Sequence, residues 1–115
     1  YKKVNTPSLI ADDFFGSAIV LSKPIPSEDA PDLSNARGRM TVNGEQVSEG
    51  TTGEILGHPY EALAWLANSL AERNQYLKSG EIVMLGSIVE THWVKRNDEI
   101  AVEIDGIGGV LVKFI

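Results

Sequence analysis

Two adjacent carboxylates, Asp12 and Asp13, are the residues whose types and spacing most directly suggest chemistry. They precede residues 14–21, which are rich in aromatic and β-branched side chains and predict a buried strand. A carboxylate at the edge of such a strand can reach into a cavity and exchange protons there, or it can simply cap the turn before the strand. The residues by themselves favour neither role.

Three further titratable residues have ordinary structural explanations. His58 lies just before Pro59, where it could act as an acid–base group or orient the start of a helix by bonding a backbone group, and we favour the second role. His92 has no metal-ligand spacing and is expected on a packed surface strand. Glu54 lies in a glycine-rich loop, so we expect it to be solvated.

Other catalytic and ligand-binding patterns are missing from the sequence. Gly106, Gly108 and Gly109 could suggest a nucleotide loop, but such a loop leads into a helix, whereas a strand is expected here. We therefore expect a tight β turn. There is no P-loop and no G-x-S-x-G elbow, and the lack of cysteine excludes disulfides, thiolate metal sites and cysteine nucleophiles.

Composition is that of an ordinary globular protein. The 115 residues suit one domain, 1–115, and 43% of them are hydrophobic. The net charge of -6 disfavours nucleic acid as a partner, and no apolar stretch approaches the roughly 20 residues that cross a membrane. We expect a cytoplasmic protein. The chain begins with Tyr1, without a helix cap or targeting signal, and is expected to start inside a longer one.

Hydrophobic periodicity predicts an α+β fold. Asn43-Gly44 predicts a two-residue hairpin turn, and the proline-rich stretch 24–35 predicts a surface loop. A helix is predicted to start at Pro59 and run to about residue 74, because the apolar residues recur at helical spacing. Three more strands are predicted, a continuous apolar one at 82–85 and two half-buried antiparallel ones at 99–104 and 110–114.

Several groups of residues follow one another in the order typical of one enzyme family. They are Met40-Thr41-x-Asn43-x-Glu45-x-Val47-x-x-Gly50, Glu54-x-Leu56-Gly57-His58-Pro59, Ala64-Trp65-Leu66-Ala67, Leu77-x-x-Gly80-Glu81-Ile82-Val83-x-x-Gly86, and Gly106-Ile107-Gly108-Gly109-Val110. With these motifs the sequence, from about Asn5 to its last residue, resembles the 2-keto-4-pentenoate hydratase and 2-oxo-3-hexenedioate (4-oxalocrotonate) decarboxylase family, within the fumarylacetoacetate hydrolase superfamily.

The resemblance implies a lyase that adds water to, or removes carbon dioxide from, 2-oxo or 2-hydroxy dienoic acids of aromatic catabolism. It also implies Mg²⁺ or Mn²⁺, which chelates the 2-oxo acid and stabilises enolate-like charge. The family's three glutamate ligands and catalytic lysine lie upstream of the matched segment, so we assign no catalytic residue here. Since the sequence has no Glu-x-Glu motif, we expect no complete metal site in this segment.

Two short segments correspond to the family's substrate-binding residues. Asp12-Asp13 resembles an Asp-Asn pair at the mouth of the site. Leu85-Gly86-Ser87 resembles a Thr-Gly-small turn that approaches the substrate carboxylate, and glycine there permits close backbone contact. The resemblance thus implies that these five residues form part of the cavity wall.

This chain departs from the family pattern in both segments. Asp13 replaces an asparagine and adds negative charge beside an anionic substrate, and Leu85 replaces a threonine and lacks its hydroxyl. Phe14 and Phe15 stand where the family has small residues. A changed substrate or a lost activity is therefore an open alternative.

The resemblance implies a mixed, strongly curved β-sheet packed against the main helix. We expect a small 2-oxo acid as the ligand. Because an incomplete fold would expose apolar surface, we also expect a homo-oligomer. The alternatives are an acylpyruvate-type hydrolase or isomerase of the same superfamily, or a noncatalytic module that is a truncated remnant or completes its site with another polypeptide.

Overall fold

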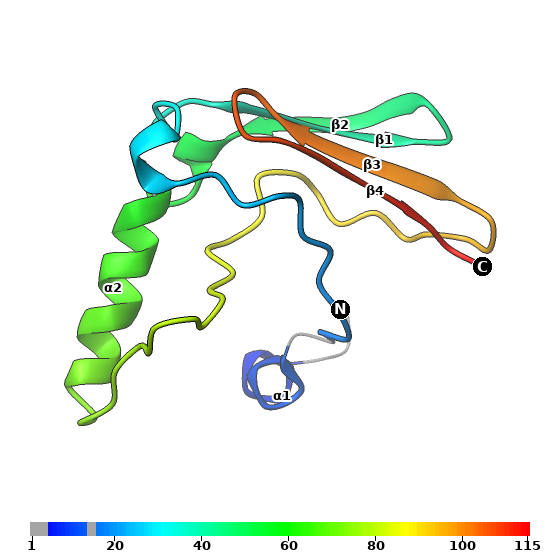
Figure 1. The fold of residues 1–115 in the computed structure, drawn as a ribbon. Helices are drawn as coiled ribbons and strands as arrows, with labels where there is room; N and C mark the ends of the chain where they lie inside the picture. The colour runs from blue at the N-terminus through cyan, green and yellow to red at the C-terminus, as the bar shows by residue number, and fades with distance from the viewer. Residues whose placement is uncertain (1–4, 14–15) are drawn as a thin grey trace.

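A four-stranded antiparallel sheet organises the chain (Figure 1). The computed structural model describes residues 5–13 and 16–115. The strand order is β2-β1-β3-β4, and all three pairings are antiparallel. The helices are α1 (Thr6–Ala11) and α2 (Pro59–Ala71), and the strands are β1 (Arg37–Val42), β2 (Glu45–Thr51), β3 (Glu99–Ile104) and β4 (Gly108–Lys113). The predicted α+β class with one main helix is confirmed, but the described residues contain none of the parallel pairing that a mixed sheet would include.

The β1–β2 turn is the one predicted from Asn43-Gly44. Asn43 has φ +52° and Gly44 has φ +83°, so both adopt the left-handed conformation of a type I′ turn. The Asn43 side chain also joins this turn to β3. Its Nδ2 donates to Asp98 Oδ1 over 2.9 Å, and its Oδ1 accepts from the Glu99 backbone N–H over 2.9 Å. One residue therefore sets the turn and fixes the neighbouring strand beside it.

The sheet has one apolar and one charged face. Met40 and Ile100 are buried on the apolar face, which continues on the paired residues Val102 and Val110. On the opposite face Arg39 donates from Nη2 to Asp105 Oδ1 over 2.7 Å. This division follows from the alternation of side chains along a strand, and it confirms the two half-buried strands predicted from the C-terminal residues.

Two extended segments cross beneath the apolar face without joining the sheet. They are residues 16–26 and 79–95, which pass under the sheet in Figure 1 as blue and yellow coil. The strands predicted at 16–21 and 82–85 are therefore wrong, and residues 14–15 lie outside the described part. His92, expected on a surface strand, lies exposed on the second segment. Strand-forming side chains do not make a strand where no ladder partner is available.

Thr52 joins the loop before β1 to the end of β2. Its side chain is only 4% exposed. Its Oγ1 accepts from the Ala36 N–H over 2.9 Å and donates to the Leu33 carbonyl over 2.6 Å. Its own N–H donates to the Ala36 carbonyl over 2.9 Å. The predicted loop 24–35 forms no strand, and Thr52 fixes the point where the chain leaves this loop and enters β1.

Local caps define both helices. His58 caps α2, because its Nδ1 accepts from the Tyr60 N–H over 3.1 Å, and the structural role favoured for this histidine is confirmed. Helix α1 was not predicted, although Asn5 caps it by accepting from the Ser8 N–H over 2.9 Å. Glu54 is exposed, as expected, and it also accepts from the Thr51 N–H over 3.0 Å in the capping box of a short 3-10 helix, Thr52–Glu54.

Helix α2 does not cover the sheet. Figure 1 shows it extending from one end of the sheet instead of lying across a face. Its apolar stripe, predicted to pack against the sheet, is half-buried at Leu63, Leu66 and Leu70. The prediction that the sheet packs against this helix is therefore wrong for the described residues. The prediction of the helix itself is confirmed.

The chain exposes more surface than a closed domain of its mass. Its accessible area is 9065 Å², against roughly 6,200 Å² for a typical folded protein of 12.5 kDa. The radius of gyration is 15.7 Å, where about 13 Å is typical for this length. Large side chains such as Met84 (72% exposed) and Leu21 (61% exposed) account for part of this surface. Apolar surface of this extent is typical of an interaction face.

Replacing Thr52 should show how much the junction contributes to stability. Thr52→Val keeps the shape but leaves the Ala36 N–H and the Leu33 carbonyl without a partner, at an expected cost of about 1–3 kcal/mol in free energy of unfolding. Thr52→Ser retains the hydroxyl and is the matched control. Urea unfolding followed by far-UV circular dichroism measures both. Equal unfolding midpoints for the two variants would contradict this role.

Asp98 should make the free energy of unfolding depend on pH in the acid range, below the ordinary pKa of an aspartate. The Lys95 backbone N–H and the Asn43 amide hold the pKa of the Asp98 carboxyl below its usual value. Because the pKa is lowered on folding, this contribution is present above about pH 4 and is lost as the pH falls through the folded-state pKa. Asp98→Asn should therefore lower the urea midpoint at pH 7, and the difference from the unmodified protein should shrink at acid pH.

The control for this experiment is Asp29→Asn, on the surface loop. It should change the midpoint little at either pH. A constant difference between Asp98→Asn and the unmodified protein from pH 7 to acid pH would argue against the assigned hydrogen bonds.

Candidate functional site

Gly86 and Ser87 lie in the wall of a hollow under the sheet, which we call the Gly86 hollow. Its volume is about 360 Å³, within the range of small-molecule sites. One side is formed by the extended chain at Val20 and Leu21, and the other by apolar sheet residues including Val102. The wall is therefore mostly hydrocarbon, with a glycine backbone and a hydroxyl on one edge.

The Gly86-Ser87 turn has a backbone conformation that requires glycine. Gly86 has φ +144°, in a region that residues with a side chain rarely adopt. The Ser87 hydroxyl donates to the Val89 carbonyl over 2.5 Å, which folds the chain back on itself. Farther along, the Glu90 N–H donates to Ser48 Oγ of β2 over 3.4 Å. The turn is thus tied both to itself and to the sheet.

A glycine pair in the sheet receives the residue that follows this turn. Gly38 of β1 and Gly50 of β2 are direct cross-strand partners, so they lie on the same face. A Cβ at Gly38 would collide with Ile88 Cδ1, and one at Gly50 would collide with the Ile88 carbonyl oxygen. We call this pair the glycine notch. Ile88, 9% exposed, fills it and is among the few buried side chains.

Sequence reasoning missed the glycine notch and Ile88. The available signal was a glycine just beyond the far end of each predicted hairpin strand, because a glycine that proves to lie inside a strand often marks a place where another backbone approaches closely. Gly50 appeared in the sequence as a loop residue, and Gly38 lay outside the predicted hairpin. The approach of a segment about 40 residues away is not visible in either pattern.

Leu85 faces a different hollow from its two neighbours. It lines a hollow of about 260 Å³ together with Trp65 and Leu66 of α2. Met84 lines both hollows and lies between them. The three residues predicted to line one cavity therefore line two hollows. Gly86 and Ser87 line the Gly86 hollow under the sheet, and Leu85 lines the hollow beside α2.

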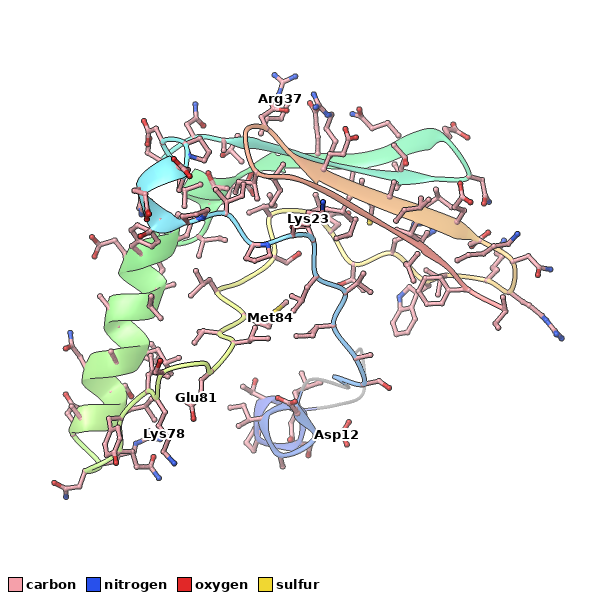
Figure 2. The ribbon with its side chains drawn as sticks, in the orientation of Figure 1. Asp12, Lys23, Arg37, Lys78, Glu81 and Met84 are labelled. Atoms are coloured by element: carbon pink, nitrogen blue, oxygen red, sulfur yellow. The ribbon has the colours of Figure 1, made fainter. Side chains whose placement is uncertain are left out.

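Asp12 and Asp13 lie apart from the turn. Both are exposed at the end of α1, and neither lines the hollows that contain Leu85, Gly86 or Ser87. Figure 2 places Asp12 on α1, away from the segment that carries Met84. Asp12 caps α1, and the Asp13 carbonyl accepts from the Gly16 N–H over 2.8 Å. Both bonds are made by backbone groups, so they test neither role of the two carboxylates, and substrate binding by the pair stays a prediction.

A larger hollow of about 590 Å³ adjoins the Gly86 hollow. The two share Leu21, Ser22 and Ile107, and the larger one extends past Lys23 toward Tyr60. No predicted site residue lines it. We place the candidate site at the Gly86 hollow because a glycine at positive φ, a hydroxyl and a sheet-anchored backbone meet there.

The described residues do not fit a divalent cation on their own. Across residues 5–13 and 16–115, no three His, Asp or Glu side chains converge to hold a metal ion. Mg²⁺ and Mn²⁺ need several oxygen ligands at one point. Nothing in this geometry therefore assigns a ligand of the implied cation to this chain.

In the same part of the chain, residues 5–13 and 16–115, no helix is long and apolar enough to span a bilayer.

The chain matches one protein family and several curated relatives over nearly its whole length. The family description "Fumarylacetoacetate (FAA) hydrolase C-terminal" matches residues 2–114. The chain is 32% identical over 113 residues to a 4-oxalocrotonate decarboxylase of Pseudomonas putida, covering 98% of this chain and 43% of that protein. It is 30% identical over 112 residues to a 2-hydroxyhexa-2,4-dienoate hydratase of Comamonas testosteroni, covering 97% and 42%.

Solved structures agree with these sequence matches. A 4-oxalocrotonate decarboxylase from Pseudomonas putida G7, complexed with calcium and acetate, superposes with a TM-score of 0.70 at 39% identity. The match covers 74% of this chain and 33% of that one. The same enzyme complexed with magnesium and adipate gives the same TM-score and identity. The chain spans about two fifths of the curated relatives that it matches.

The family match over nearly the whole chain and the fold shared with the solved structures agree with each other. This chain belongs to the fumarylacetoacetate hydrolase family, and the relatives that it matches at about 30% identity include 4-oxalocrotonate decarboxylases and 2-keto-4-pentenoate hydratases.

Proposed function

We propose that this chain forms part of the substrate cavity of a divalent-metal-dependent lyase that acts on 2-oxo or 2-hydroxy dienoic acids. The observation that carries the proposal is the Gly86 hollow, where an apolar wall meets the Gly86-Ser87 turn. An apolar wall suits the carbon chain of a dienoate, and the turn suits its carboxylate. Relatives named as hydratases and decarboxylases, and a neighbour complexed with the dicarboxylate adipate, support this class of substrate.

Each part of the turn has a distinct proposed role. The backbone at Gly86 can approach the substrate closely because no side chain stands in the way. The Ser87 hydroxyl, now donating to the Val89 carbonyl, can turn to donate to a carboxylate oxygen. Val102 and Val110 exclude water from the carbon chain, which strengthens such polar contacts.

In this proposal, the divalent cation is bound by residues other than these 115. When bound, Mg²⁺ or Mn²⁺ would chelate the 2-oxo acid and stabilise negative charge. Because the described residues do not bring together a ligand set, we propose that the carboxylate ligands come from elsewhere, in the same polypeptide or in another. Calcium and magnesium in the complexes of the related decarboxylase support a divalent cation.

The same observation supports the noncatalytic alternative. A truncated, noncatalytic module would also form one wall of the cavity and would also lack a set of metal ligands among its described residues. An acylpyruvate-type hydrolase or isomerase remains the alternative reaction for the same cavity. Product analysis distinguishes these reactions, since hydration, decarboxylation and hydrolysis of a dienoate or acylpyruvate leave different carbon skeletons.

Self-association is part of the proposal. The exposed apolar surface, including Met84 and Leu21, favours the homo-oligomer that the sequence predicts. A cytoplasmic location likewise stays a prediction. Sedimentation velocity over a range of protein concentrations measures the assembly directly, and a monomer at all concentrations would count against this part.

Ser87→Ala tests the proposed site. The longest polypeptide that carries this chain is assayed with Mg²⁺ for loss of the ultraviolet absorbance of 2-hydroxypenta-2,4-dienoate, and for carbon dioxide release from 2-oxo-3-hexenedioate. We expect KM for the substrate that is turned over to rise roughly tenfold or more, since a hydrogen bond to a charged group is worth about 1.5–3 kcal/mol.

Ser79→Ala is the matched control. It removes an exposed hydroxyl that lines none of the described hollows, so KM should not change. Equal KM values for Ser87→Ala and Ser79→Ala would remove Ser87 from the site. Absence of turnover of both substrates by a longer, unmodified polypeptide that contains these 115 residues would contradict the proposed function itself.

A further inference from the structure

The glycine notch lowers the stability of the sheet, and the sheet alone does not explain why two glycines stand there. Glycine inside a strand weakens the strand, because it loses more conformational freedom on folding and has no side chain to pack. Here two glycines, Gly38 and Gly50, face each other directly across β1 and β2. Larger residues on this apolar face would bury more hydrocarbon. The pair is explained by what occupies the space, which is Ile88.

Ile88 connects the notch to the turn. It directly follows Ser87 and is two residues after Gly86, so a shift of its backbone moves both. Its Cδ1 occupies the space beside Gly38, and its carbonyl oxygen occupies the space beside Gly50. On the far side of Ile88, the bond from the Glu90 N–H to Ser48 Oγ holds the same segment on β2.

We propose that Gly38 is a positioning residue that acts through Ile88 to place the Gly86-Ser87 turn at the wall of the substrate cavity. The proposal rests on the proposed function for its kinetic consequence, and on the geometry of the described residues for its structural one. Gly38 touches no substrate. It provides the space without which Ile88 and the turn must move away from the sheet.

A double-variant cycle isolates this interaction. Gly38→Ala places a methyl group against Ile88 Cδ1, and Ile88→Val removes that one carbon. We expect Gly38→Ala to raise KM about tenfold with kcat changed less than threefold. In the Ile88→Val background, the same Gly38→Ala change should alter KM less than threefold, because Cδ1 is gone and the next atom, Cγ1 at 3.2 Å, has to shift by only a few tenths of an ångström.

A second readout reports the position of the turn without substrate. The backbone amide signals of Gly86 and Ser87 in nuclear magnetic resonance spectra should shift in Gly38→Ala and return toward the Ile88→Val positions in the double variant. Gly44→Ala is the matched control. It strains the turn of the same hairpin at φ +83° but places its methyl group near no other atom, so it should lower stability without moving KM or these amides.

The outcomes separate the two proposals. If the unmodified protein turns over neither substrate, the proposed function fails, and the amide signals alone decide the positioning role. If Gly38→Ala lowers the unfolding midpoint but leaves KM and the amide signals unchanged, Gly38 is merely structural and the inference is overturned. If Gly38→Ala does not fold, Ile88→Ala empties the notch instead, and unchanged amide signals in that variant would equally overturn it.

Discussion

The apolar face of the sheet has to be covered, and the other features of this structure depend on how that is done. Within the described residues, cover comes from two extended segments and from Ile88 in the glycine notch. Helix α2 leaves the sheet at one end and contributes little there (Figure 1). Since burial of apolar surface is the main driving force of folding, partial cover leaves hollows along the face and apolar side chains in solvent.

The same constraint connects the fold to the candidate site. The segment that carries Gly86 and Ser87 is held because Ile88 fits the notch and Glu90 bonds to β2. The hollow beside that segment is apolar because the sheet face behind it is apolar. In Figure 2 Arg37 projects from the other side of the sheet, so the charged face and the hollow are kept apart.

Local signals predicted local structure well. Asn43-Gly44 specified its turn because few residues adopt two successive positive φ angles, and Pro59 with His58 specified the start of α2. The strand predicted at 82–85 and the described part, 16–21, of the strand predicted at 14–21 did not form, because hydrophobicity indicates a tendency to be buried and does not supply a ladder partner. The glycine notch could not be predicted, because it depends on contact between residues about 40 and 50 positions apart.

We propose, as the central claim, that these 115 residues build one wall of a lyase cavity whose cation is held by residues elsewhere. The most direct test is turnover of 2-hydroxypenta-2,4-dienoate, with Mg²⁺ or Mn²⁺ added, by material whose intact mass equals that of the 115 residues. The account predicts no turnover by this material and turnover by a longer polypeptide that contains it. Turnover by the 115 residues alone would contradict the account, because the metal ligands would then have to lie among them.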